Sequence, residues 1–219
     1  MSWLFGNQVA TIILYFSFWG RSNMTLKKWF YLSWTSFAFG IAATLILGLI
    51  MFFTNPNYQN SGLGEVGFNL ITLTIAGATA SVLSQMGFFG YLILKWIAIS
   101  VFRSKVIWDY LQFILSIVAI GDLIYLRYVN YGVGSGIGNY IVLPLFILVV
   151  AIAVSYYKMK LTNRSAFIPT FFVMTAVTIL EAVPIFRENN IDSLVVVLIP
   201  LMICNAWQLL ILHKVIGNK

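Results

Sequence analysis

The chain has 219 residues, of which 61% are hydrophobic and 9% are charged, and its formal net charge is +7. A soluble domain has about 45–50% apolar and about 25% charged residues, so the composition excludes a soluble globular protein and indicates an integral membrane protein. The long apolar runs favour transmembrane helices over an outer-membrane barrel, whose strands would alternate apolar and polar residues.

The positions of the charges and the single cysteine exclude further classes. The basic residues form short clusters at the ends of apolar runs and no stripe on a soluble face, so nucleic acid is not predicted as a partner. The one cysteine, Cys204, excludes an internal disulfide and cannot form a structural zinc site by itself. We expect Cys204 to pack as a small apolar residue.

The N-terminal segment differs from the rest of the chain. Residues 3–19 are too short and too interrupted by polar residues for a span, and they lack the basic region of a signal peptide. Met24 then opens the stretch MTLKKWFYL, directly before the first long apolar run. We interpret residues 1–23 as an N-terminal extension or interfacial segment and residues 24–219 as a six-helix transmembrane domain.

Apolar windows of about twenty residues predict six spans in this domain. The predicted spans are residues 29–53, 66–95, 106–128, 139–157, 165–186 and 191–213. Most of the 13 basic residues lie before the first span or after the second, fourth and sixth, which is one side of the membrane. The positive-inside rule makes that side cytoplasmic. We therefore predict an all-α, multi-pass bundle in the plasma membrane, with both termini cytoplasmic.

The second apolar run, residues 66–102, is too long for one perpendicular crossing. As a helix it would be about 55 Å long, while a hydrocarbon core is about 30 Å thick. The charge alternation allows one crossing here, so we predict a long, bent second helix whose continuation over residues 93–103 tilts or lies along the interface. Gly87 and Gly90 are the predicted hinge. The alternative is a re-entrant hairpin.

One face of this second helix carries small and polar residues at helical spacing. The residues are Thr74, Gly77, Ser81, Ser84, Gln85 and Phe88. Small residues allow another helix to approach closely, and Gln85 can form a hydrogen bond across the contact. We interpret the face as a surface for helix packing or for a partner; a ligand-lining face is the alternative. Gly40, Thr44 and Gly48 repeat the small-residue spacing on the first helix.

Polar residues within the other spans are candidates for a site because ionisable groups at membrane depth are costly. Asp122 and Arg127 lie on the third span and Glu181 on the fifth, at a similar predicted depth. Arg127 can extend outward or meet Glu181, while Asp122 needs another partner or stays protonated. Asn205 and Gln208 share one face of the sixth span. Structural pairing and a proton-relay or ligand site both remain open.

Catalytic motifs are not found in the sequence. It has no cluster of histidine, cysteine and carboxylate residues at metal-binding spacing, no nucleophile elbow and no phosphate-binding loop. We therefore predict no enzyme activity, no catalytic residue, no metal site and no cofactor.

Several separated segments, in this order, resemble the KbaA family of KinB-signalling pathway activation proteins from spore-forming Bacillus relatives. They are SQMGFFGYL (84–92), DLIYLRY (122–128), TNRSAFIP (162–169), the turn at 181–184 and CNAWQLLILH (204–213). The resemblance extends from Met24 to His213. The chain departs from the family pattern at Ala182, where an aromatic residue is expected, and at Lys95, where a histidine is expected.

The resemblance implies a multi-pass plasma-membrane protein that promotes signalling by the membrane sensor histidine kinase KinB, and so the phosphorelay that leads to sporulation. It implies no catalytic site. Our leading hypothesis is a non-enzymatic membrane regulator that binds this kinase through helix faces. The alternative is a small-molecule or proton-coupled transporter or receptor with a polar site near Asp122, Arg127 and Glu181, whose ligand the sequence does not identify.

Overall fold

The computed structural model describes residues 26–54, 63–131, 138–187 and 190–217. Within these ranges the chain is helical and contains no strand. Six helices in these ranges are long and apolar enough to cross a membrane, as the sequence predicts. The interpretation of residues 1–23 as an extension concerns a segment outside the described ranges.

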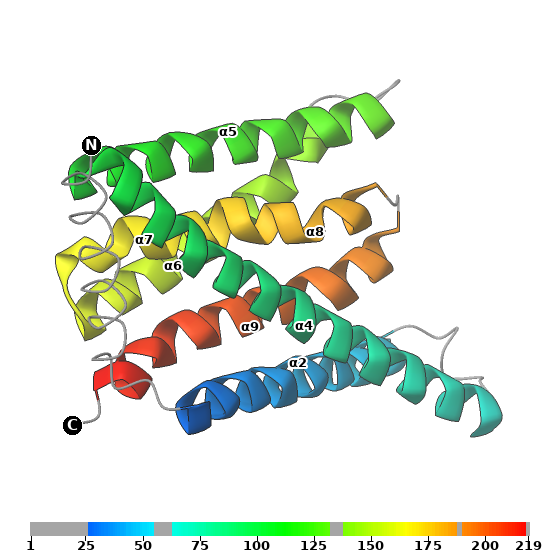
Figure 1. Cartoon of the computed structure of the whole chain (residues 1–219). Helices are drawn as coiled ribbons and strands as arrows, with labels where there is room; N and C mark the ends of the chain where they lie inside the picture. The colour runs from blue at the N-terminus through cyan, green and yellow to red at the C-terminus, as the bar shows by residue number, and fades with distance from the viewer. Residues whose placement is uncertain (1–25, 55–62, 132–137, 188–189, 218–219) are drawn as a thin grey trace, which may run out of the picture.

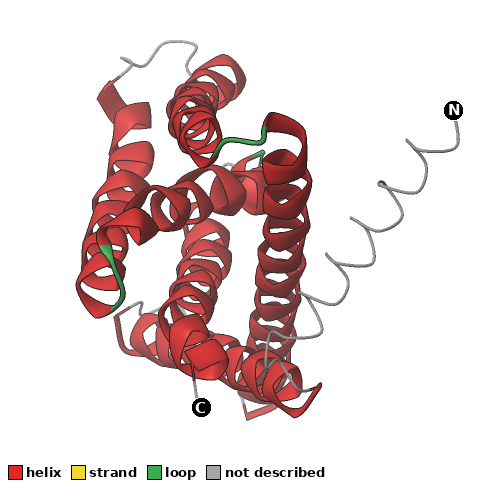
Figure 2. Ribbon diagram, turned by 60° about the vertical axis from the view of Figure 1, so that its left-hand side comes forward, coloured by secondary structure: helices red, strands yellow, loops and turns green. Residues whose placement is uncertain are grey.

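Among the described residues, five of the six spans are single helices, and the fifth span along the chain is composite. The helices are α2 (Leu26–Thr54), α4 (Leu63–Phe102), α5 (Lys105–Tyr131), α6 (Gly138–Leu161) and α9 (Ile191–Gly217). The fifth span consists of a 3₁₀ turn η1 (Arg164–Ala166), α7 (Phe167–Phe172), a π-helical turn η2 (Val173–Val177) and α8 (Thr178–Phe186). Figure 2 shows the described ribbon as helices joined by short loops.

The helices form two groups. The most extensive helix contacts join α2, α4 and α9 to one another, and α5, α6 and α7 form the second group. In Figure 1, α4 runs obliquely across the bundle from its junction with α5 to a point beyond α2, in front of α9. α8 contacts α9, α4 and α5, so it lies where the two groups meet.

The long second span is one unbroken helix. α4 has 40 residues, which corresponds to about 60 Å, and it continues through Gly87 and Gly90 without interruption. The re-entrant hairpin is therefore wrong, while the bend stays a prediction. The oblique course of α4 is one way in which a helix longer than the bilayer is accommodated.

Arg103 ends α4 and turns the chain into α5. Its φ is +51°, in the left-handed region that commonly ends helices and that glycine adopts most easily. The Arg103 backbone N–H donates to the Ile99 carbonyl at 3.0 Å, and α5 begins two residues later at Lys105. This short connection holds Arg103 and Lys105 together at one end of the bundle.

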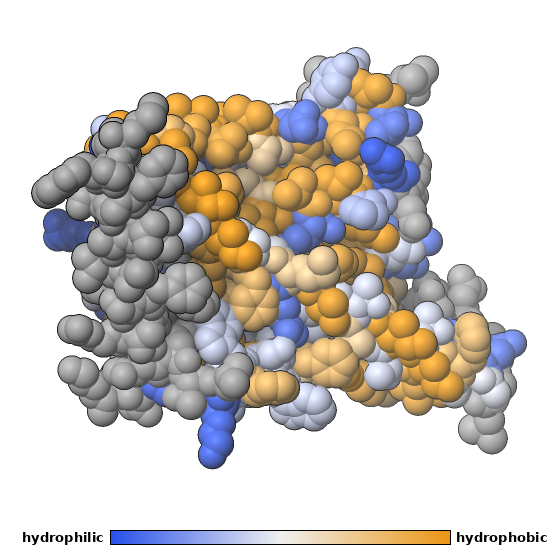
Figure 3. Space-filling model, viewed as in Figure 1, coloured by the Kyte–Doolittle hydropathy of each residue, from blue (hydrophilic) through white to orange (hydrophobic). Residues whose placement is uncertain are grey.

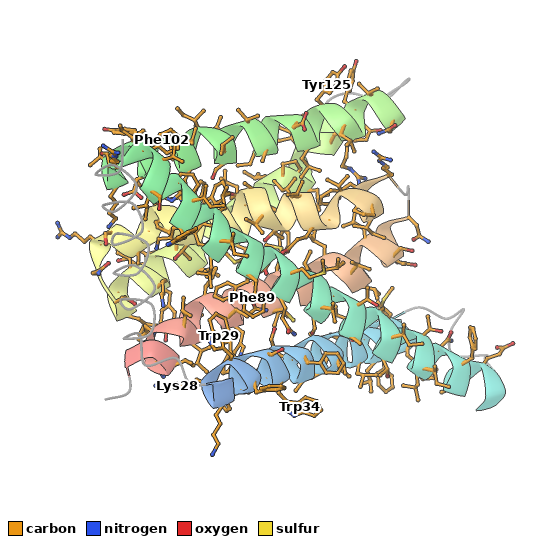
Figure 4. All side chains as sticks on the ribbon, in the orientation of Figure 1. Lys28, Trp29, Trp34, Phe89, Phe102 and Tyr125 are labelled. Atoms are coloured by element: carbon orange, nitrogen blue, oxygen red, sulfur yellow. The ribbon has the colours of Figure 1, made fainter. Side chains whose placement is uncertain are left out.

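Basic residues gather at that same end. Figure 4 shows Lys28 at the start of α2 and Phe102 at the end of α4 on one side, with Tyr125 near the other side. Lys158 and Lys160 lie in the last turn of α6, which ends on the side of Lys28 in Figure 1. Basic residues thus gather at one end of the bundle, as the sequence predicts. The compartment that this end faces stays a prediction.

Large apolar side chains cover much of the outside of the bundle. Trp34, Phe53 and Met86 are among many that are more than 65% exposed. Figure 3 shows broad hydrophobic areas on the face that is drawn. A water-exposed surface of this composition would be an aggregation hazard, whereas a lipid-facing one is expected of a membrane-spanning bundle.

Candidate functional site

Helices α2 and α4 cross in direct backbone contact at two glycines. A Cβ atom added to Gly77 would lie 2.7 Å from the Gly40 carbonyl oxygen and would overlap the Thr44 hydroxyl. A Cβ atom added to Gly40 would lie 2.8 Å from the Gly77 carbonyl oxygen. Small residues allow this approach, so the small-residue faces predicted on both helices lie against each other inside the bundle.

A serine and a cysteine tie the crossing to α9. Ser81 Oγ donates to the Ser36 carbonyl oxygen at 3.0 Å. Cys204 Sγ lies 3.4 Å from both Ser81 Oγ and the Ser36 carbonyl oxygen, and all three residues are buried. Cys204 packs as the small residue that the sequence predicts, and it also makes these weak polar contacts.

Gln208 connects the same three helices through its side-chain amide. Its Nε2 donates to Ser36 Oγ at 2.8 Å and to Ser84 Oγ at 2.9 Å. Ser84 Oγ in turn donates to Asn205 Oδ1 at 2.7 Å. All four side chains are at most 1% exposed. Such a buried and largely satisfied network specifies one packing arrangement, because any other leaves polar atoms unpaired.

Asn205 extends this network to α8, in the composite fifth span. Its Nδ2 donates to Thr178 Oγ1 at 2.9 Å and to Glu181 Oε2 at 2.9 Å. The other carboxyl oxygen, Glu181 Oε1, is buried and has no hydrogen-bond partner among the described residues. Asn205 is therefore the polar link between the α2–α4–α9 group and the composite fifth span.

The Glu181 carboxyl group fills the space beside a glycine of α4. A Cβ atom added to Gly87 would overlap the carboxyl group and would lie 2.8 Å from a Val177 methyl group. At Gly90, by contrast, an added Cβ atom would meet nothing within 4 Å. Of the two predicted hinge residues, Gly87 thus makes room for Glu181, whereas Gly90 is open to the outside.

The π-helical turn η2 precedes the two residues that face Asn205. Thr178 Oγ1 donates to the Val173 carbonyl oxygen, five residues earlier, at 3.0 Å. A π-turn contains one more residue than an α-turn, so it rotates the side chains that follow about the helix axis. We attribute the common orientation of Thr178 and Glu181 towards α9 to this extra residue. Neither η2 nor Thr178 was predicted from the sequence.

Contacts of Gln85 and nearby aromatic residues extend the packing of α2 against α4 towards the basic end. Ser33 Oγ donates to Gln85 Oε1, and Gln85 Nε2 donates to the Ser33 carbonyl oxygen at 3.3 Å. The rings of Trp29 and Phe89 have centroids 5.0 Å apart, and Figure 4 shows them together between the two helices. Ser33 and Ser36 were not predicted as part of this contact, although they continue the spacing of Gly40 and Thr44 on α2.

The remaining predicted residues have different surroundings. Phe88 is 1% exposed in the core, and the Thr74 hydroxyl donates to the Leu70 carbonyl oxygen of its own helix at 2.8 Å. Asp122 is exposed on α5 and Arg127 is partly buried there. Glu181 forms its hydrogen bond with Asn205, so no polar centre formed by Asp122, Arg127 and Glu181 is seen in the described ranges.

The described residues contain no group of three or more histidine, cysteine or carboxylate side chains that could hold a metal ion. The chemistry of the buried network is that of neutral amides, hydroxyls and one carboxyl group. These groups can hold helices in one arrangement and exchange a proton.

Comparison with known proteins identifies the family. The sequence model of the KbaA family, described as KinB-signalling pathway activation in sporulation, matches residues 40–215. A protein of Bacillus subtilis (strain 168) named KinB-signaling pathway activation protein is 38% identical over 152 residues, which are 69% of this chain and 77% of that protein. No solved structure matches the chain. Since the family match runs from the glycine crossing of α2 to the end of α9, the chain belongs to the KbaA family.

Proposed function

We propose that the chain activates the KinB signalling pathway of sporulation from within the plasma membrane, without catalysis, by binding a membrane sensor histidine kinase along the sides of its helices. The family match carries this proposal, because it covers the described bundle from α2 to α9 and names the pathway. The composition supports it further, since the described chain consists of helices suited to a bilayer. In this proposal the basic end of the bundle faces the cytoplasm.

The outward face of α4 is the surface that we assign to the kinase. Gly77, Ser81 and Ser84 pack against α2 and α9, so the small-residue face is occupied within the chain. On the opposite side of α4, exposed apolar residues recur at helical spacing. They are Ile75, Val82, Met86 and Ile93.

The hydrogen bonds on the inward side of α4 would connect a kinase contact on its outward side to α2 and α9. A force on the outward face of α4 acts on a helix that hydrogen bonds and close backbone contact tie to α2 and α9. The bundle would therefore present α4 to the kinase as part of a rigid unit. A differential affinity of about 1–3 kcal/mol for the two kinase states is enough to change the output several-fold.

Cysteine crosslinking in membranes tests the surface. Single cysteines at Val82 and Met86, in a Cys204→Ser background, should crosslink to cysteines in the transmembrane helices of the co-expressed kinase. Matched control positions are Ile114 and Ile117 on α5, whose exposed fractions of 55% each lie between those of Val82 and Met86. Crosslinking at the α4 positions alone supports the proposal; equal or exclusive crosslinking at the α5 positions contradicts the assignment to α4.

Genetics tests the function itself. Deletion of the gene in its native host should lower kinase-dependent phosphorelay output and spore number, and the intact gene should restore both. In a strain that lacks the kinase, deletion should have no further effect. An equal loss of sporulation with and without the kinase would mean that the protein acts elsewhere.

A further inference from the structure

The carboxyl group of Glu181 lies within the fifth span and has no basic partner among the described residues. Asn205 Nδ2 donates to Oε2 at 2.9 Å, while Oε1 is buried and accepts no hydrogen bond from the described residues. Within those residues no lysine, arginine or histidine forms an ion pair with it. The pathway role proposed above does not require this group, so its chemistry needs a separate explanation.

The groups that face Glu181 from the neighbouring helices are uncharged. From α4 it meets Gly87, and from α9 it meets the Asn205 amide. α5 also packs against α8, but its Asp122 is exposed and its Arg127 does not pair with Glu181.

The charged residues of α4 and α9 lie further along those helices. Counted from Gly87 on α4 and from Asn205 on α9, each is at least two helical turns away, which corresponds to about 12 Å or more. They are Glu65, Lys95, Asp192, His213 and Lys214. Electrostatic compensation of an ionised Glu181 by these residues is therefore weak.

The protonation state follows from this environment. An ionised carboxylate without a nearby cation is costly at membrane depth, because neither water nor a counter-charge replaces its hydration. A neutral carboxylic acid avoids that cost and still accepts the Asn205 hydrogen bond at Oε2. We propose that Glu181 is a proton-binding site, with the proton on Oε1 in the folded protein. Loss of this proton weakens the packing of α8 against α4 and α9.

Infrared spectroscopy of the full-length chain in lipid tests the proton directly. The chain has three glutamates, Glu65, Glu181 and Glu188, so an E65Q/E188Q variant carries Glu181 as its one glutamate carboxyl group. With isotope-labelled glutamate, this variant should show at neutral pH the carbonyl band of a protonated carboxylic acid, shifted by the label. E181Q should lack the band. A labelled spectrum with only the ionised carboxylate band would overturn the proposal.

Unfolding measurements test the linkage between the proton and packing. A group that holds its proton more tightly when folded stabilises at low pH, and this contribution is lost as the pH rises through its folded-state titration. The unfolding midpoint of the wild type should therefore fall as the infrared band disappears, and that of E181Q should not. The E65Q/E188Q variant is the control and should behave as the wild type does.

A sodium titration separates a proton site from a cation site. At neutral pH, replacement of choline chloride by sodium chloride should leave the unfolding midpoint of the wild type unchanged. A rise that is specific to sodium and absent from E181Q would overturn the proposal in favour of a bound cation. Because none of these measurements uses the kinase, their failure is distinguishable from failure of the proposed function.

Discussion

The carboxyl group of Glu181 lies against α4 in the space that a side chain would fill at Gly87. Glycine at this position lets the composite fifth span approach α4, and the contact brings Glu181 to the Asn205 amide. One missing side chain thus makes this polar link between α9 and the composite fifth span possible.

Two glycines of α4 provide a matched test of that contact. Gly87→Ala places a methyl group on the Glu181 carboxyl group, so we expect a loss of about 1–3 kcal/mol, the usual cost of overpacking. Gly90→Ala meets open space and should be neutral or slightly stabilising, because alanine favours helices. Unfolding of the purified protein in increasing denaturing detergent measures both. Equal stabilities would contradict the observed packing.

The crossing of α2 and α4 should be more sensitive to an added side chain than the contact at Gly87. Gly77→Leu must displace the backbone of α2, since even a Cβ atom lies too close to the Gly40 carbonyl oxygen. We expect a loss above about 3 kcal/mol, at or beyond the upper end of overpacking effects, and failure to activate signalling. Gly67→Leu, on an open part of the same helix, is the control and should leave both properties intact. Protease resistance in membranes and spore counts provide the readouts.

Asn205 should be energetically coupled to Glu181. Asn205→Leu leaves Glu181 Oε2 without its donor and the Ser84 hydroxyl without its acceptor, at a cost of about 1–3 kcal/mol. A double-mutant cycle with Glu181→Leu isolates the pair, and interhelical hydrogen bonds in membranes have coupling energies of about 0.6–1.7 kcal/mol. Additive effects in the unfolding measurements would show that the bond adds nothing to stability.

A substitution at the end of α4 is expected to stabilise the folded protein. Arg103 has a positive φ, which costs a non-glycine residue about 1–2 kcal/mol, so Arg103→Gly should raise stability by up to about 1 kcal/mol. Arg103→Val, a β-branched residue, should lower it. Thermal unfolding of the three proteins ranks them, and the order Val, Arg, Gly is expected from least to most stable. The reverse order would mean that another conformation occurs in the membrane.

Several features could be predicted because they depend on local composition. The six spans found in the described ranges follow from apolar runs of sufficient length, and small residues at helical spacing predict one closely packing face on the first helix and one on the second. The position of Asn205 and Gln208 on one face of the same helix likewise follows from helical periodicity. Each of these properties is contained in a single segment.

The partner of Glu181 could not be predicted in this way. A pairing with Arg127 was one of the possibilities from charge alone, whereas the folded chain joins Glu181 to Asn205. The difference depends on the rotation of α8 after the turn Val173–Val177 and on its contact with Gly87. Neither has a clear signature in the linear sequence.

By itself, therefore, the sequence determined the six helices of the described ranges that are long and apolar enough to cross a membrane, together with the basic end, and it carried the resemblance to the family. These properties require only hydrophobic length, charge position and residue order, which are local quantities. The tertiary structure alone decided that the small-residue face of α4 is internal and that Asn205 joins α9 to the composite fifth span. Which faces meet depends on the tilt and rotation of whole helices, and these result from the packing of all of them together.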